Sequence, residues 1–135
     1  MIVFLQKDNV IYDEMVDKAA PYTVKKGDPK LSQDTFGFYG NDAKTNIDRT
    51  TTPEEVIIIY RCRQVEALKK TGTGEAIVHG DRLYFIVADK KVSPNFSGSA
   101  GTDFYFCGWA KEDAGANEST VLMNFDGTRH TEAGR

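Results

Sequence analysis

The residue types that could carry out catalysis or bind a metal are few in this chain and lie far apart in the sequence. Of its two histidines, His79 precedes a Gly-Asp turn and His130 lies near the C-terminus. No pair of cysteines or histidines has the short spacing of a zinc site. Gly72-Thr73-Gly74 lacks the Gly-Lys-Ser/Thr ending of a phosphate-binding loop, and no Gly-x-Ser-x-Gly segment would expose a nucleophilic serine. We therefore expect no catalytic residue, no metal site and no cofactor.

The acidic residues near the start of the chain do not form a recognisable calcium-binding loop. Asp8, Asp13, Glu14 and Asp17 lack the alternate spacing around a glycine that such a loop requires, so we interpret them as solvated charge. The net charge of the whole chain is -3. This balance argues against the broad basic patch that non-specific binding to nucleic acid needs.

Cys62 and Cys107 are the only cysteines, and both lie in apolar or β-branched stretches. A thiol in such a stretch usually behaves as a small hydrophobic side chain. The chain starts without the basic and apolar regions of a secretory signal, and it has no run of about 18 apolar residues that could span a membrane. We therefore expect a cytosolic setting and no disulfide between the two cysteines.

The spacing of glycine among β-branched and aromatic residues predicts an all-β protein. Most of the 12 glycines separate short apolar runs, a pattern typical of hairpins and barrels. A chain of 135 residues fits one compact core. The expected strands are residues 2–5, 10–16, 22–25, 30–32, 35–39, 56–63, 64–68, 82–87, 91–92, 104–110 and 120–125.

One segment carries signals for both a helix and a strand. Residues 52–55 have the composition of a helix start, and residues 69–72 would suit a helix end. Between them, residues 56–60 are β-branched and aromatic, which favours a pleated surface. A helix would also have to bury three consecutive isoleucines that point in different directions. We predict that residues 56–68 are extended.

Alternation within the strands predicts which side chains form the core. Residues 104–109 are apolar on both faces, and residues 120–125 are apolar mainly on one. Residues 127–135 are polar, and we expect a mobile tail there. The side chains expected to be mostly buried are Phe85, Val87, Phe104, Phe106, Trp109, Val121 and Met123.

Several segments resemble one protein family when they are taken in order. Residues 74–85 contain Ala-Ile, then Gly-Asp, then Leu-Tyr-Phe, and residues 24–31 contain an earlier Gly-Asp-Pro turn. Residues 107–114 and 119–127 are similar to the closing strands of the same family. The matching segments run from residue 22 to residue 127. Together they resemble the family of capsid cement (head decoration) proteins of tailed bacteriophages, which was formerly catalogued as a domain of unknown function. Members usually have a glycine near residues 60–64, where this chain has Tyr60-Arg61-Cys62-Arg63.

The resemblance implies a structural virion protein without enzymatic activity. It implies a small β-barrel or β-tulip-like body at residues 21–127, an extended N-terminal arm at residues 1–20 and a flexible tail at residues 128–135. The protein would be made in the cytoplasm of a host bacterium and would bind the outer surface of the phage head, bridging subunits of the major capsid protein. It would also bind itself, as a homotrimer or, as second choice, a dimer, and it would bind neither nucleic acid nor membrane.

The N-terminal segment is unusually apolar for a chain end, and two interpretations stay open for it. It could be an edge strand packed on its own barrel, or an arm that pairs with a neighbouring subunit or the coat protein. The residues expected to bind the partner are Ile2, Val3, Phe4, Leu5, Val10, Ile11 and Tyr12.

Two other classes of protein remain as alternatives. One is another virion component, such as a head-completion, tail or spike protein, and the other is a small ligand-binding β-barrel. A ligand-binding barrel would need polar groups that converge in a pocket, and the sequence suggests none.

Overall fold

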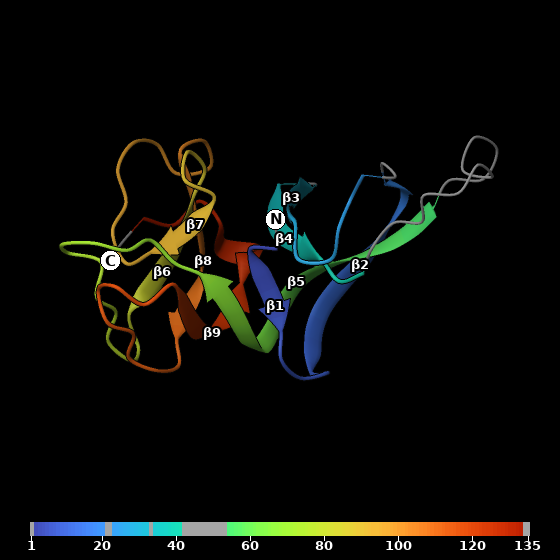
Figure 1. Ribbon diagram of the computed structural model, residues 1–135. Coiled ribbons are helices and arrows are strands. Elements are labelled where there is room, and N and C mark those ends of the chain that lie inside the picture. Colours follow the sequence, from blue (N-terminus) through green and yellow to red (C-terminus); the bar gives the residue numbers. More distant parts are fainter. Residues whose placement is uncertain (1, 21–22, 33, 42–53, 134–135) are drawn as a thin grey trace.

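The strands of this protein form one strongly curled sheet, seen here in a computed structural model that describes residues 2–20, 23–32, 34–41 and 54–133 (Figure 1). The described residues contain no α-helix, which confirms the all-β prediction. The elements are β1 (Phe4–Gln6), β2 (Ile11–Ala20), β3 (Pro29–Ser32), β4 (Thr35–Tyr39), β5 (Glu54–Leu68), β6 (Arg82–Ile86), β7 (Lys91–Ser93), β8 (Phe104–Ala110), β9 (Thr120–Asp126) and the 3-10 turn η2 (Gly127–Arg129).

Strand β5 is the longest element and pairs along both of its edges. On one edge, β2 pairs with its first half and β1 with its second half. On the other edge, β4 pairs at Ile58 and Ile59, and β9 pairs from Arg61 to Leu68. The prediction that residues 56–68 are extended is confirmed, although they form one strand rather than two. The helix-start residues Thr52 and Pro53 lie outside the described residues.

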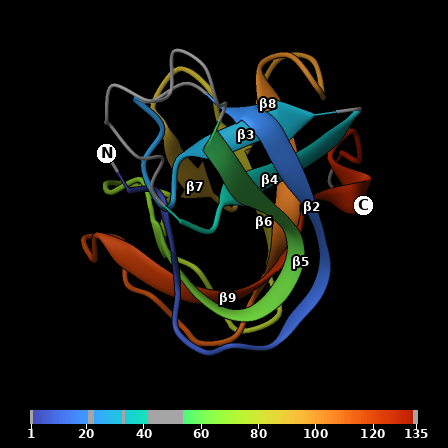
Figure 2. The same cartoon turned by 90° about the vertical axis from the view of Figure 1, so that its right-hand side faces the viewer.

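The second half of the chain closes the sheet into a small barrel. From β5 the order of paired strands runs β9, β8, β6, β7. The end of β5 then meets β7 through a parallel bridge between Lys69 and Val92, and the amide of Lys70 donates to the carbonyl of Val92 at 2.8 Å. Figure 2 shows how β5 and β9 sweep around this curl. The expected barrel-like body is therefore present.

Aromatic rings from distant parts of the chain fill the centre of the fold. Phe4 of β1 is fully buried and lies against Phe36, Phe38, Phe85 and Phe125, with ring centroids between 5.0 and 6.0 Å apart. Rings packed edge-on or offset gain about 0.5–1.5 kcal/mol per pair beyond their area. The first strand is therefore part of the central core.

The alternation of β5 buries its two faces in different clusters. Ile59 lies in the central core, with the half-buried Ile57 packed against it. Val56, Ile58 and Tyr60 point to the other side, where Val24, Tyr39 and Ala20 cover them. Both faces of this half of the strand are thus apolar because both are covered, which explains the isoleucine run without a helix.

The core prediction is confirmed for five residues, holds in part for Trp109 and is wrong for Val87. Phe85, Phe104, Phe106, Val121 and Met123 are buried. Val87 is 39% exposed, so its expected burial is wrong: β6 ends at Ile86 and the chain turns there. Trp109 is only half-buried, because it lies on the outer face of β8 against Phe106 at 5.0 Å.

Two further segments differ from their expected form. Residues 23–25 are not a strand, and Tyr22 lies outside the described residues. Of the tail expected to be mobile, residues 127–133 are described and rest on the body. His130 is only 9% exposed, its carbonyl accepts from the amide of Phe106 at 3.0 Å, and Glu132 pairs with Arg82 at 3.2 Å.

The burial of Phe4 gives a direct test of whether β1 belongs to the fold. Replacing Phe4 with Ala should lower the free energy of unfolding by about 3–5 kcal/mol, because a fully enclosed ring is lost and a cavity remains. The matched control is Tyr12→Ala, since Tyr12 is 59% exposed and its loss should cost about 1 kcal/mol or less. Urea unfolding measures both, and equal small losses would show that β1 does not pack in the core.

Candidate partner-binding surface

The structure separates the predicted partner-binding residues into buried and accessible groups. Val3 and Phe4 are 2% and 0% exposed and belong to the core, so they cannot contact a partner while β1 is in place. Leu5, Val10 and Ile11 are half-buried. Ile2 and Tyr12 are 48% and 59% exposed and remain accessible. Of the two interpretations of this segment, an edge strand packed on its own barrel describes β1.

The segment that stays accessible is the outer edge of β2. No other described strand pairs with the edge of β2 that faces away from β5. Tyr12 and Val16 are exposed along this strand, as are the acidic side chains of Asp13 and Glu14. Register shifts on either side of Asp13 interrupt the pairing with β5. Charges and bulges of this kind keep an edge strand from pairing indiscriminately, while its backbone groups stay available.

Beside this edge, a β-bulge in β5 opens a groove. Cys62 pairs with Phe125 and Val65 with Met123, so Arg63 and Gln64 together face Asn124. Gln64 has a φ of 60°, in the left-handed region that side chains other than glycine rarely adopt. A bulge of this kind bends the strand that carries it and locally disrupts the pairing.

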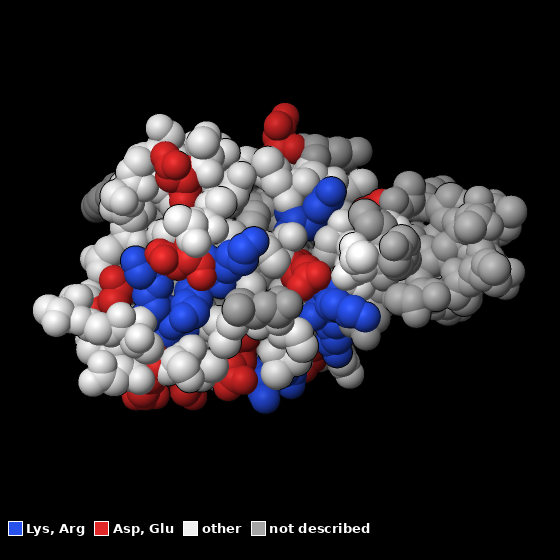
Figure 3. Space-filling view, turned by 45° about the horizontal axis from the view of Figure 1, so that its top comes forward, with Lys and Arg blue, Asp and Glu red and all other residues white. Residues whose placement is uncertain are grey.

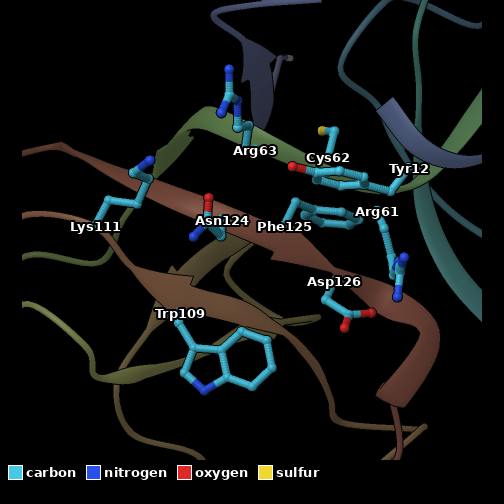
Figure 4. Close-up of a pocket in the computed structure, with 9 residues that line it drawn as sticks. All are labelled: Tyr12, Arg61, Cys62, Arg63, Trp109, Lys111, Asn124, Phe125 and Asp126. Atoms are coloured by element: carbon cyan, nitrogen blue, oxygen red, sulfur yellow. The ribbon is translucent and has the colours of Figure 1, made fainter. Parts of the chain in front are cut away.

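We call this depression the Trp109 groove (Figure 4). Its residues come from four strands and one adjoining turn: Tyr12 of β2, Arg61, Cys62 and Arg63 of β5, Asn124, Phe125 and Asp126 of β9, and Trp109 and Lys111 at the end of β8. Gly108 holds β8 close to β9 here, since a Cβ at this position would collide with the carbonyl oxygen of Asn124. Glycine also tolerates the φ of 138° found there.

Positive charge dominates the groove. Arg63 pairs with Asp8 at 3.0 Å, and the guanidinium of Arg61 lies 5.8 Å from the centre of the Tyr12 ring. The thiol of Cys62 is a poor nucleophile. Burial raises its pKa to about 12, so it stays protonated near neutral pH. Arg, Tyr and Trp are enriched among the residues that contribute most of the binding energy at protein interfaces.

The most buried charged side chain has a structural explanation. Lys69 is 1% exposed, and its ammonium donates to the carbonyl oxygens of Lys70, Gly115 and Glu118 at 2.7–3.2 Å. Burial lowers its pKa, but each N–H bond has an acceptor. Lys69 thus fastens the loop before β9 to the end of β5.

Other kinds of site are not found among the described residues. They contain no group of three or more His, Cys, Asp or Glu side chains that could hold a metal ion. His79 is exposed in its turn, and Cys62 and Cys107 are buried free thiols, as the sequence predicts. Within the same part of the chain, no helix is long and apolar enough to cross a membrane. Figure 3 shows Lys and Arg side chains intermixed with Asp and Glu on the face it displays.

Comparison with known proteins does not identify a function for this surface. The chain matches no family model, no curated protein and no solved structure. The interpretation of the surface therefore rests on the residues themselves.

The groove was missed in the sequence although one signal pointed to it. Arg61 and Arg63 alternate with the buried Cys62 in an otherwise apolar strand, which places two cations on one side of β5. The other cation, Lys111, and Trp109 arrive from β8, a neighbour of β9 rather than of β5. Their meeting depends on strand order, which the local pattern does not contain.

The positive φ of Gln64 reverses the usual strand preference at that position. Valine is favoured over glycine in ordinary strands by up to about 1 kcal/mol. At Gln64, Gln64→Gly should instead be more stable than Gln64→Val by about 1–2 kcal/mol, because a β-branched side chain is strained there. The control pair is Arg61→Gly and Arg61→Val, of which the valine variant should have the higher free energy of unfolding. Urea unfolding measures the free energy of unfolding of all four variants. If valine were more stable than glycine at both positions, the bulge at Gln64 would be ruled out.

Proposed function

We propose that this chain is a capsid cement protein of a tailed bacteriophage, which binds the outer surface of the head and bridges subunits of the major capsid protein. The observation that carries the proposal is the outer edge of β2, which presents exposed Tyr12 and Val16 on a rigid all-β body. The resemblance of residues 22–127 to that family supports it independently of the edge.

Addition of a partner strand is the physical basis of the binding. No other strand among the described residues pairs with the edge of β2 that faces away from β5, so N–H and C=O groups of residues 12–16 on that edge can pair with an extended segment of a coat subunit. Tyr12 and Val16 would supply apolar contact, while Asp13 and Glu14 would restrict the choice of partner. Such binding requires no bond to be made or broken.

The sheet to which β2 belongs could carry mechanical load, as a protein that clamps coat subunits together must. A force applied to β2 passes directly to β5, and from β5 to β1, β4 and β9 through the ladder of main-chain hydrogen bonds. A head filled with DNA pushes its coat subunits apart, and a clamp resists that separation through binding energy alone. A homotrimer, as the family resemblance implies, would multiply the number of such attachments per particle.

The proposal predicts that the purified chain binds assembled heads built from the coat protein of the same phage. The chain should sediment with the heads and raise the temperature at which they break open, and light scattering of the free chain should give three copies per particle. Val16→Lys should abolish co-sedimentation while leaving the chain folded, because Val16 is 42% exposed. Lys25→Gln is the control on an exposed residue outside β2. A folded chain that fails to sediment with expanded and unexpanded heads would refute the proposal.

A further inference from the structure

We propose that the Trp109 groove binds an acidic segment of a partner protein in extended conformation. This site shares Tyr12 with the β2 surface described above, but its other residues come from β5, β9 and the end of β8. The inference holds whether or not the partner belongs to a virion. It rests on the charge, the aromatic content and the shape of the groove.

The charge of the groove is opposite to that of the chain. Its lining contains the cations Arg61, Arg63 and Lys111 against the single carboxylate of Asp126, while the whole chain carries a net charge of -3. That carboxylate is already engaged, since one of its oxygens accepts from the amide and the hydroxyl of Thr128 at 3.0 and 2.5 Å. Asp126 is therefore held by its own turn and does not neutralise the groove fully.

Two of the three cations form no ion pair in the described part of the chain, although Arg61 is the cross-strand neighbour of Asp13 and Asp126. Arg63 pairs with Asp8, whereas neither Arg61 nor Lys111 forms an ion pair there. Arg61 instead lies over the exposed ring of Tyr12. Unpaired cations that flank a concave surface attract carboxylates and orient them on arrival.

The aromatic residues make the groove a protein-binding surface. Tyr, Trp and Arg are the residue types that contribute most to binding energy at protein interfaces. Here Tyr12 is 59% exposed and Trp109 half-buried, so both rings can contact a ligand while their positions stay fixed. Asn124 comes from β9 next to Phe125, and its exposed amide can bond to a peptide backbone (Figure 4).

The conformation of the ligand follows from the strands that form the groove. Arg61 and Arg63 are two residues apart on β5, which corresponds to about 6–7 Å along a strand. An extended peptide with a carboxylate at every second residue has the same spacing. A nucleic-acid backbone fits less well, because it needs a broad basic surface, and the lining of this groove includes the carboxylate of Asp126.

The groove contains its own reporter, since Trp109 is the only tryptophan in the chain. The probe is a short synthetic peptide of alternating glutamate and threonine, and its control has glutamine in place of glutamate. Titrated into the full chain, the acidic peptide should change the Trp109 emission in a saturable manner. The glutamine peptide should bind at least about tenfold more weakly, and added salt should weaken the binding of the acidic peptide.

Substitutions in the groove test whether the acidic peptide binds there. The double variant Arg61→Gln/Lys111→Gln should raise the dissociation constant of the acidic peptide about fivefold to tenfold, whereas Lys25→Gln should leave it within about twofold. Circular dichroism of each variant should match the original chain. The proposal is overturned if no saturable change occurs, if both variants bind equally, or if a single-stranded oligonucleotide binds more tightly than the acidic peptide.

Discussion

The pairing of β5 along both of its edges is the constraint on which the rest of the structure depends. Its first half is held between β2 and β4, its second half between β1 and β9, and its end returns to β7 through Lys69. β5 thus takes part both in the pairing with β2 and β4 and in the barrel-like curl that continues through β9, β8, β6 and β7. The bulge at Gln64 supplies the bend, at the cost of one residue in the left-handed region.

The two candidate binding surfaces follow from the same arrangement. β2 pairs with β5 along one edge, and no other strand of the described residues pairs with its opposite edge. The bulge interrupts the register of β5 with β9, and the side chains of Arg61, Asn124 and Trp109 line the groove at this point. Both surfaces are therefore consequences of how β5 is paired, and both are held by a core in which Phe4 contacts four other rings.

The sequence predicted what depends on local pattern and missed what depends on distant pairing. The bounds of β4 and β8 follow directly from turn residues and alternation, and both agree with the structure. Phe4 could be recognised as apolar, but its place at the centre depends on the pairing of β1 with residues 65–67. Val87 is apolar and yet exposed because β6 ends one residue earlier. The groove combines residues from β2, β5, β8 and β9, an assembly that alternation within one strand cannot reveal.

Native-state hydrogen exchange tests most directly whether β5 joins the whole fold. The amides of residues 56–62 and 65–68 should exchange only through global unfolding, with the same free energy on both sides of the bulge. Along β2, the amides that bond to β5 should be protected, and those that face outward should exchange rapidly. If the two halves of β5 exchanged with clearly different free energies, they would be separate folding units, and the view of β5 as the shared support of both binding surfaces would be wrong.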